Sequence, residues 1–489
     1  MAKISRVITR RAFLGGAAGA AVLGSAPAAR ARTTARADAG ARGRVVVLGA
    51  GLAGMTTALD LRAAGWDVVV LEARDRVGGR VHTLYAPFSD GLHAECGGES
   101  IDDSHYAIQA MLKRFGLSTE RRAPLKPYDS AVYYRGTREP LAAFLTNDNG
   151  NGLNDYLRFD NAVSALADGI NPDHPERAKN AERLDAQSLD DFVRAQKLAP
   201  SARFLVELEN RGEYNAELRD ISLLFVAQQV AVSSSSLLSL TEAETMRIAG
   251  GNSLLPRAMA KALGHVVRLS SPVTRVEHDR DGVRVHTSDG FVDGAWLVVA
   301  APLMPMRHVD FAPALPASVQ QVISGLDLGH AAKVIHEYAT GFWRAEGSSG
   351  FTLTDLPFHI GWSPTDSRPA TAAGLLSQFI TGDAARLAAQ LSEQRRRTVF
   401  TQQLNTVYPE GVPLATDNIA TMVWAHERFT GGGYAVYRPG QMAPFWPVLR
   451  SGYGRIRFAG EHTESLAGYM ESAIRSGHRI AKGLGRAPQ

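Results

Sequence analysis

Short runs of mostly apolar residues near the start of the chain predict two buried parallel strands, at residues 44–48 and 67–71. A parallel strand that is covered on both faces is apolar along nearly its whole length. The segment between the two runs, from about Leu52 to Ala64, predicts a helix, and Gly65 can cap its end. This order predicts a strand–helix–strand unit of an α/β protein.

Later segments show three further patterns. Residues 296–301 form another apolar run, which predicts a buried strand. Apolar and polar residues alternate around a turn at residues 281–285, which predicts a hairpin, and again at residues 331–336, which predicts a strand. Residues 150–235 are polar and rich in Ala, Asp, Arg and Leu, which predicts amphipathic helices with a solvated charged face.

Composition narrows the classes of function. The 489 residues are enough for two or three domains, and 45% hydrophobic and 21% charged residues are ordinary for a globular protein. The net charge of +4 becomes −1 without the five basic residues of segment 1–31, so charge gives no case for nucleic-acid binding. Cys96 is the only cysteine, which excludes an intramolecular disulfide and a Cys-rich metal site. A lone cysteine is most often a small buried hydrophobic residue.

The N-terminal segment predicts an export signal. A twin-arginine pattern at residues 9–14 is followed by a weakly apolar run at 12–26 and by an A-x-A cleavage site at 29–31. The alternative is a disordered basic tail. We therefore expect a signal peptide over 1–31, a linker over 32–43, and a periplasmic or extracellular protein. The apolar run is too short and too rich in Gly and Ala for a span, so we expect no stable membrane insertion.

The turn after the first strand predicts a dinucleotide site. Gly49 permits a tight turn, Gly51 lets the backbone approach a pyrophosphate, and Gly54 lets the helix pack close to the strand. The first N–H groups of the helix point at the phosphates. Glu72 ends the second strand and is placed to accept hydrogen bonds from ribose hydroxyls, which disfavours NADP. These features do not separate NAD from FAD.

Longer motifs resemble the flavin monoamine oxidase and L-amino acid oxidase family from about residue 44 to 483. Residues 72–80 read E-A-R-x-x-x-G-G-R, similar to the FAD signature of this family, and residues 458–463 with 468–473 are similar to its closing motif. The runs 95–101, 247–252, 271–276 and 311–316 resemble other family motifs in the same order. Arg80 can form a charge-assisted hydrogen bond to a phosphate. The alternative for Arg74 and Arg80 is a solvated face. The resemblance and the turn together assign FAD binding to Gly49, Gly51, Ala53, Gly54, Glu72, Ala73, Arg74, Gly79, Arg80, Gly97, Gly98, Glu99, Ser100, Val273, Gly460, Glu461, Tyr469 and Met470.

The resemblance also implies the fold. We expect an α/β protein with a discontinuous Rossmann-type FAD-binding domain and an α+β substrate domain, which has a sheet and covering helices. The FAD domain collects residues 44–125, 240–315 and 420–489, and the substrate domain collects residues 126–239 and 316–419.

The catalytic residues that the resemblance implies are Lys333, Tyr434, Tyr469 and Trp424. Lys333 corresponds to a family lysine that holds a water against flavin N5. The two tyrosines correspond to a pair that face each other in front of the flavin and form a slot for an amine. The alternatives are a surface lysine and two core tyrosines. Mammalian monoamine oxidases carry a flavin-linked cysteine where this chain has Gly433, so we expect non-covalent FAD.

The resemblance implies oxidation of a primary amine by O₂ to an imine, then aldehyde and ammonia, with hydrogen peroxide as the second product. L-amino acid oxidases carry an arginine for the substrate carboxylate in the region of residues 97–100, where an inward-facing Glu99 would repel it. An arginine of the helical region, such as Arg203 or Arg211, is the alternative carboxylate partner. Three alternative functions therefore stay open: an L-amino acid oxidase, a dehydrogenase with a protein electron acceptor, and a flavin-holding protein without turnover. A homodimer is also possible from the sequence.

Hydrolase motifs are missing, and no carboxylate cluster has metal spacing, so we assign no metal. His82, His93 and His462 lie inside motifs, and we expect them to be hydrogen-bonded structural histidines. Loss of a hydride requires the free amine rather than a strong protein base, so the chemistry needs no histidine.

Overall fold

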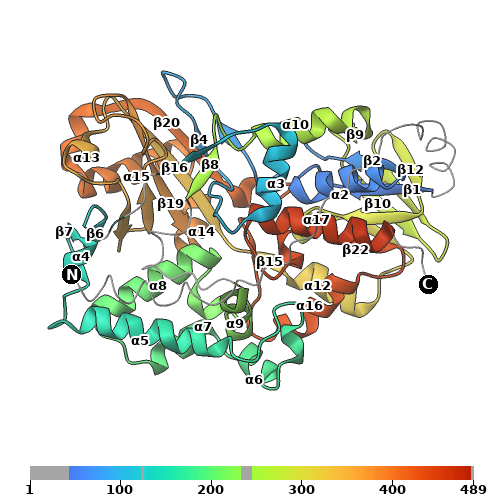
Figure 1. Cartoon of the computed structure of the whole chain (residues 1–489), viewed down its shortest axis with the longest axis horizontal. Coiled ribbons are helices and arrows are strands. Elements are labelled where there is room, and N and C mark those ends of the chain that lie inside the picture. Colours follow the sequence, from blue (N-terminus) through green and yellow to red (C-terminus); the bar gives the residue numbers. More distant parts are fainter. Residues whose placement is uncertain (1–42, 123–125, 127, 233–244, 486–489) are drawn as a thin grey trace, which may run out of the picture.

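The computed structural model describes residues 43–122, 126, 128–232 and 245–485. The predicted signal peptide and all of the predicted linker except Gly43 lie outside the described residues. Figure 1 shows two regions side by side, one built around β1, β2, α2 and α17 and the other around β16, β19 and β20. The α/β fold with two sheet regions agrees with the sequence-based expectation.

A five-stranded parallel sheet forms the first region. Its order is β22-β13-β1-β2-β9, with the strand at the N-terminal end of the described chain in the centre. The three strands predicted in this region are confirmed, and their apolar side chains are buried, as a sheet covered on both faces requires. The bounds are β1 (Arg44–Leu48), β2 (Asp67–Leu71), β9 (Val267–Arg268), β13 (Trp296–Val299) and β22 (Ile456–Phe458).

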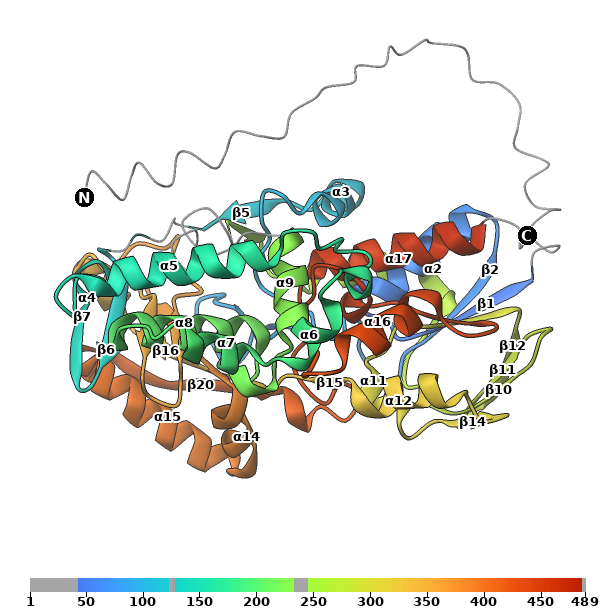
Figure 2. The same cartoon turned by 90° about the horizontal axis from the view of Figure 1, so that it is seen from below.

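Two helices from opposite ends of the described chain pack side by side on this sheet (Figures 1 and 2). They are α2 (Leu52–Ala63), which begins at the glycine-rich turn, and α17 (Met470–Gly485). Their buried side chains share one hydrophobic core with β1 and β2. The fold therefore brings the first and last sequence motifs to one place.

A four-stranded sheet lies next in the first region, in the order β12-β11-β10-β14. Strands β10 and β11 pair antiparallel across the predicted hairpin turn, which confirms that prediction. The bounds are β10 (Val273–His278), β11 (Val283–Thr287), β12 (Gly290–Gly294) and β14 (Asp310–Ala312).

A seven-stranded sheet, β20-β16-β19-β18-β17-β6-β7, forms the second region. All eight residues of β16 are buried, and the predicted strand at 331–336 lies within it. The bounds are β6 (Ala131–Tyr134), β7 (Thr137–Pro140), β16 (Ala331–Tyr338), β17 (Thr352–Thr354), β18 (Ile360–Trp362), β19 (Gly374–Thr381) and β20 (Ala415–Val423).

The helices predicted within residues 150–235 form a layer beside this sheet (Figures 1 and 2). Helix α8 contacts both α5 and β19, so α8 is the helix through which this layer packs against the sheet. The domain limits proposed from the sequence stay a prediction, and β20 runs across the limit at residue 420. The helices of this layer are α5 (Asn151–Leu166), α6 (Ala181–Ala186), α7 (Leu189–Ala195), α8 (Pro200–Tyr214) and α9 (Leu223–Val232).

Smaller elements connect these parts. The remaining strands pair in twos as β3 (Thr83–Leu84) with β4 (Ala94–Glu95), β5 (Thr119–Arg121) with β8 (Met246–Ile248), and β15 (Asp327–Leu328) with β21 (Ala435–Val436). The remaining α-helices are α3 (Tyr106–Phe115), α4 (Leu141–Phe144), α10 (Leu254–Leu263), α11 (Leu303–Met306), α12 (Ala317–Gly325), α13 (Phe342–Ala345), α14 (Gly382–Gln390), α15 (Glu393–Val407) and α16 (Met442–Ser451).

Candidate active site

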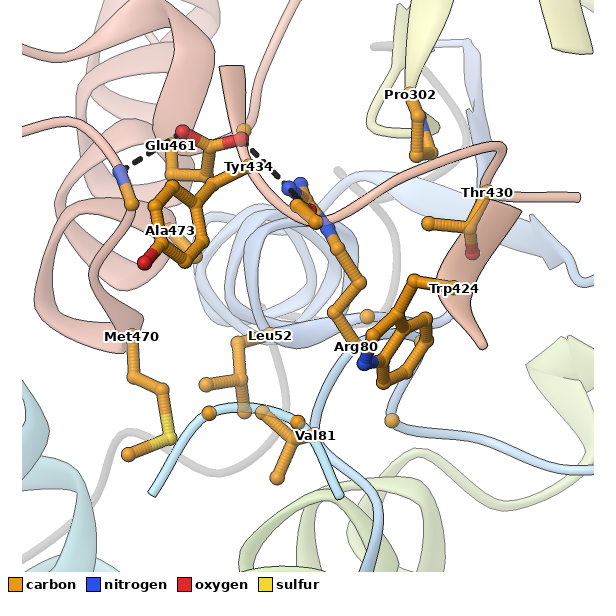
Figure 3. Close-up of a pocket in the computed structure, with 18 of the residues that line it drawn as sticks. Leu52, Arg80, Val81, Pro302, Trp424, Thr430, Tyr434, Glu461, Met470 and Ala473 are labelled. Atoms are coloured by element: carbon orange, nitrogen blue, oxygen red, sulfur yellow. Dashed lines mark hydrogen bonds and ion pairs between the residues drawn. The ribbon is translucent and has the colours of Figure 1, made fainter. Parts of the chain in front are cut away.

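A cavity of about 580 Å³ runs between the two regions. It begins at the turn between β1 and α2 and extends to β16 and the C-terminal end of α8. All of the predicted FAD-binding residues except Gly54 line it, and so do Lys333, Tyr434, Tyr469 and Trp424. Figure 3 shows part of this lining, with Tyr434 and Glu461 from the C-terminal segments next to Arg80 from the N-terminal one.

The glycine-rich turn has room for a ligand on one side and none on the other. A Cβ at Gly51 would meet no protein atom within 4 Å and would enter the cavity. A Cβ at Gly54 would lie 2.0 Å from the Gly49 carbonyl oxygen, so this glycine permits the close contact between α2 and β1. Gly54 therefore acts in packing, which explains why it does not line the cavity.

Glu72 lies at the end of β2 with its carboxylate facing the turn. One carboxylate oxygen accepts the Ala50 N–H at 2.8 Å and the other accepts the Arg74 N–H at 2.9 Å. Each oxygen has a second lone pair, and Glu72 lines the cavity, so ribose hydroxyls can still bind it. The geometry at Glu72 and Gly51 fits the dinucleotide half of FAD.

Arg74 and Arg80 are partly buried in the cavity wall rather than solvated. Arg74 donates to Glu427 Oε2 at 3.2 Å and to Thr430 Oγ1 at 2.5 Å. Arg80 donates to Glu461 Oε1 at 2.7 Å and to the Gly433 carbonyl at 2.8 Å (Figure 3). Arg80 thus ties the E-A-R motif to the closing motif, and its predicted contact with phosphate stays a prediction.

Glu461 is the buried partner that holds the closing motif. Its other oxygen, Oε2, accepts the Gly468 N–H at 2.9 Å. Burial, the largest single influence, would raise the pKa of Glu461, but the charge and hydrogen bond of Arg80, together with His462 and the Gly468 N–H, lower the pKa below its usual range. The carboxylate is therefore ionised, and it orders the loop that leads to Tyr469.

His462, next to Glu461, differs from expectation. The ring is buried, and neither ring nitrogen has a hydrogen-bond partner among the described residues. Burial lowers the pKa of His462 to about 4, so the ring is neutral at pH 7. The prediction of a hydrogen-bonded histidine is wrong for this residue, because its ring packs against the backbone of Gly460 instead.

Lys333 is a buried cation whose three N–H groups all have acceptors. Nζ donates to Glu99 Oε2 at 3.0 Å, to the Glu95 carbonyl at 2.9 Å and to the Gly97 carbonyl at 3.4 Å. It also lies 4.8 Å from the centre of the Trp362 ring. The alternative of a surface lysine is excluded by this burial. A water on Nζ requires the longest of the three bonds, to Gly97, to give way.

Glu99 makes an ion pair with Lys333. Its Oε1 also accepts the Trp362 Nε1–H at 3.0 Å. Burial would raise the pKa of Glu99, but Lys333, followed by Arg122 and Arg247, lowers it below its usual range. The argument that Glu99 would repel a substrate carboxylate is therefore wrong, because Lys333 compensates the charge of Glu99.

Glu95 behaves in the opposite way. Burial raises the pKa of Glu95 to about 7, although the Asn252 N–H and the Thr83 hydroxyl both donate to its carboxylate. A buried carboxylate with only one distant cation keeps most of its desolvation penalty. Glu95 therefore titrates near neutral pH while Glu99 stays ionised.

The two tyrosines reach the same helix through their hydroxyls. Tyr434 donates to the Gly212 carbonyl at 3.0 Å, and Tyr469 donates to Glu213 Oε1 at 3.1 Å. Gly468 has φ +86, and a Cβ there would come within 3.2 Å of the Tyr434 ring, so this glycine leaves room for the ring. Both phenol ends are thus fixed to the C-terminal turn of α8.

Trp424 closes the wall beside the Gly-Gly turn. Its Nε1–H donates to the Cys96 carbonyl at 2.8 Å, and a Cβ at Gly97 would lie 3.0 Å from the indole ring. The indole therefore packs directly on the backbone of the turn, which positions an aromatic surface inside the cavity.

Several cavity residues were missed from the sequence. Arg203 and Arg211, offered as carboxylate partners, do not line the cavity, since they pair with Glu207 at 2.6 Å and with Glu217 at 3.1 Å. Arg122 lines it instead, 3.2 Å from Ser100 Oγ and 3.7 Å from Asp366. A single helix of mixed charge carries no sequence signal for which face meets a cavity. The other missed lining residues that matter below are Glu209, Glu213 and Trp362.

The described residues hold neither a membrane-spanning helix nor a metal-binding cluster. No helix in the described ranges combines the length and the apolar character needed to cross a membrane. Within the same ranges, no three His, Cys, Asp or Glu side chains come together in a way that could hold a metal ion.

Comparison with known proteins gives consistent results. The profile of the family described as flavin containing amine oxidoreductase matches residues 52–484. A Mycobacterium tuberculosis protein that bears the name flavin-containing monoamine oxidase AofH is 32% identical over 449 residues, covering 89% of this chain and 95% of that protein. An L-amino acid dehydrogenase of Synechocystis is 26% identical over 90% of this chain and 94% of its own length. The structure of wild-type putrescine oxidase bound to putrescine superposes with a TM-score of 0.82 at 26% identity, covering 90% of this chain and 98% of that chain.

Proposed function

This chain belongs to the family of flavin-containing amine oxidoreductases, and we propose that it oxidises primary amines to aldehydes with O₂ as the electron acceptor. FAD is the cofactor of this family, and the residues around Gly51 and Glu72 fit it. Held by these residues, FAD would supply the redox chemistry: acceptance of a hydride from the carbon next to the amine nitrogen and transfer of the electrons to O₂. The overall reaction is R-CH₂-NH₂ + O₂ + H₂O → R-CHO + NH₃ + H₂O₂.

The aromatic residues of the chain hold the substrate in this scheme. Tyr434 and Tyr469 line the cavity, and their hydroxyls are fixed by α8, so the rings are held in place before an amine binds. Electron-rich ring faces suit an amine and its alkyl chain, and a water-poor slot favours the neutral amine, which is the form that loses a hydride.

Lys333 supplies positive charge next to the Gly-Gly turn. A fixed cation stabilises negative charge that develops on a reduced flavin and on O₂ as it accepts electrons. The single observation that carries the proposal is that Lys333, Tyr434 and Tyr469 line one cavity with the FAD motif residues, although they are distant in sequence.

An amine is favoured over an amino acid by the charges around the cavity. Arg122 lines the cavity near the Gly-Gly turn, and Asp366 lies 3.7 Å from it. Helix α8 contributes the carboxylates Glu209 and Glu213 to the cavity lining. A cavity wall of this kind attracts ammonium groups and disfavours an anionic substrate.

The test is anaerobic mixing of the holoprotein with a panel of primary amines and L-amino acids, followed by air. We expect amines to bleach the flavin absorption and air to restore it with release of peroxide. Bleaching by amino acids alone would replace the amine by an amino acid as substrate. No bleaching by any compound would favour a flavin-holding protein without turnover.

A dehydrogenase is the second candidate, and the Lys333–Glu99 pair favours it. A carboxylate 3.0 Å from the ammonium reduces the positive charge that a reduced flavin and O₂ experience. In the same experiment, this candidate predicts bleaching by amines followed by slow reoxidation in air and fast reoxidation by an artificial electron acceptor.

We also propose that FAD is bound without a covalent link. Gly433 has no side chain to attach, and Cys96 is buried with its thiol against the His82 carbonyl at 3.2 Å. Burial raises the pKa of Cys96 to about 12, so the reactive thiolate does not form. Acid precipitation of the protein should leave the yellow colour in the supernatant, whereas a yellow pellet would contradict the proposal.

Export by the twin-arginine route is the last part of the proposal, and the sequence of the N-terminal segment supports it. A reporter fused to residues 1–43 should leave the cytoplasm, and replacement of Arg10 and Arg11 by lysine should retain it there. Export that is unaffected by the double replacement would contradict this route.

A further inference from the structure

His105 packs against the ring of Tyr469 from outside the cavity. The two ring centres lie 5.3 Å apart with an angle of 72° between the ring planes, which is an edge-to-face arrangement. His105 is buried, with 3% of its surface exposed, and it does not line the cavity, whereas Tyr469 does. One aromatic wall of the proposed amine slot therefore has a second aromatic ring behind it.

Two helix starts bring these rings together. His105 directly precedes α3, Tyr469 directly precedes α17, and the two helices contact each other. The buried carboxylate of Glu471, in the first turn of α17, accepts the N–H groups of Ala107 at 3.1 Å and Ile108 at 2.9 Å. Such a carboxylate satisfies the first N–H groups of a helix, which have no partner within it. Glu471 thus fixes the start of α3 relative to the start of α17.

The turn before α3 also fixes the imidazole of His105. Its Nδ1 accepts the Asp102 N–H at 3.0 Å, and the His105 N–H donates to the Asp102 carbonyl at 3.0 Å. Gln109 holds the same turn, because its side-chain amide donates to the Asp102 carbonyl at 3.0 Å. Since Nδ1 is an acceptor, the proton of the neutral ring is on Nε2. The imidazole therefore cannot rotate without breaking its bond to the turn.

Burial keeps this imidazole uncharged at neutral pH. It lowers the pKa of His105 below its usual range and outweighs the nearby carboxylates of Asp102 and Glu471, while Arg475 adds to the lowering. A neutral imidazole can pack against a tyrosine ring without the cost of burying a charge. His105 therefore acts on Tyr469 through its ring and not through its charge.

Two hydrogen bonds of Tyr469 leave one rotation of its ring unrestrained. The hydroxyl donates to Glu213 Oε1 at 3.1 Å, and the Tyr469 carbonyl accepts the Ala473 N–H at 3.2 Å as α17 begins. The axis of ring rotation passes through the hydroxyl oxygen, so a bond at this atom does not select a rotation angle, and this torsion is intrinsically soft. A contact on the side of the ring does select one, and His105 provides it.

We propose that His105 is a positioning residue for amine oxidation, because it sets the rotation of the Tyr469 ring and so the part of the ring that the amine meets. The amine itself contacts Tyr469 and not His105. The electron-rich face of an aromatic ring attracts an amine, whereas the ring edge does not. This inference rests on the proposed oxidation of amines and adds a residue that acts through Tyr469.

Two replacements separate the ring of His105 from its bond to the turn. His105→Asn keeps an acceptor for the Asp102 N–H but removes the ring, whereas His105→Phe keeps a ring but removes the acceptor. We expect His105→Asn to slow anaerobic reduction of the flavin by a saturating primary amine about 2- to 10-fold, the range for an aromatic pair. His105→Phe should keep this rate within about twofold but should unfold at a lower urea concentration. FAD binding and reoxidation of the reduced flavin by O₂ should be unchanged in both variants.

Tyr106→Ala is the matched control. Tyr106 is the neighbour of His105, is 75% exposed and does not line the cavity, so its replacement should leave the rate of flavin reduction unchanged. In a Tyr469→Leu background, His105→Asn should have no further effect on this rate, because no ring is left to orient.

Three results would overturn the inference while leaving amine oxidation intact. They are an unchanged rate in His105→Asn, equal slowing by His105→Asn with and without the Tyr469 ring, and a larger loss of rate in His105→Phe than in His105→Asn. The last result would show that the rate follows the stability of the turn. Absence of flavin reduction by every amine in the unaltered holoprotein would instead remove the proposed function.

Discussion

Replacement of Lys333 by methionine tests both the contribution of the buried ion pair to stability and the role of Lys333 in flavin reoxidation. Methionine fills much of the same volume but leaves the carboxylate of Glu99 without its closest cation, which lies 3.0 Å away. It also removes the donor to the Glu95 and Gly97 carbonyls. Loss of one partner of a buried pair costs about 3–5 kcal/mol of the free energy of unfolding.

A second replacement separates the ion pair from the other contacts. In Lys333→Met with Glu99→Gln, no charge is left unpaired, and the amide can still accept the Trp362 N–H. We expect this double variant to be about 2 kcal/mol more stable at pH 7 than Lys333→Met alone. Urea unfolding of the holoproteins measures both values.

The pH dependence of the stability loss checks whether the unpaired Glu99 causes it. In Lys333→Met the pKa of Glu99 is raised, so the folded state is favoured by protonation and the stability loss grows as pH rises. The difference between the single and double variants should therefore shrink at pH 5. A double variant as unstable as the sum of the two single variants would refute the ion-pair reasoning.

The double variant should regain stability but not fast reoxidation of the flavin by O₂. Reoxidation of the reduced flavin by O₂ should slow about 10²- to 10³-fold in both variants, because both lack the cation. Recovery of fast reoxidation in the double variant would show that Lys333 acts only through Glu99.

Three further predictions follow from local geometry. Gly51→Ala should weaken FAD binding without changing the stability of the protein without FAD, because the added Cβ enters the cavity. Gly54→Ala should destabilise the fold, because the added Cβ overlaps the Gly49 carbonyl. Equal stability of the two variants in urea unfolding would contradict this. Burial raises the pKa of Glu95 to about 7, so the free energy of unfolding should decline as pH rises from 4.5 to 7. Glu95→Gln should remove about 3 kcal/mol of that decline. An unchanged dependence of stability on pH in this variant would be inconsistent with the shift. Burial lowers the pKa of His336 to about 4, so the free energy of unfolding should fall by about 3 kcal/mol as pH drops from 6.5 to 4. His336→Gln should lessen this fall, measured by denaturation curves across that pH range. A pH dependence identical to that of the unaltered protein would exclude His336 as its cause.

The strands of the first region were predictable because their sequence pattern is local. Apolar runs at 44–48, 67–71 and 296–301 predicted buried strands, and β1, β2 and β13 lie within these runs with their apolar side chains mostly buried. The glycine-rich turn was equally clear, since Gly54 allows a contact that no other residue permits. Motif order then indicated that segments far apart in sequence meet at one cavity.

The acidic end of the cavity was not predictable from the same evidence. Glu209 and Glu213 lie on a helix with Arg203 and Arg211, and all four look alike in a pattern of mixed charge. Only the packing of α8 against the sheet decides that the arginines face away and the glutamates face inward. The Lys333–Glu99 pair was hidden for a similar reason, since its partners are 234 positions apart.

Anaerobic titration of the yellow holoprotein with a primary amine, followed by admission of air, tests whether the cavity oxidises amines. We expect the flavin absorption to disappear on addition of the amine and to return in air with one peroxide released per flavin. A flavin that stays oxidised with every primary amine would contradict this expectation.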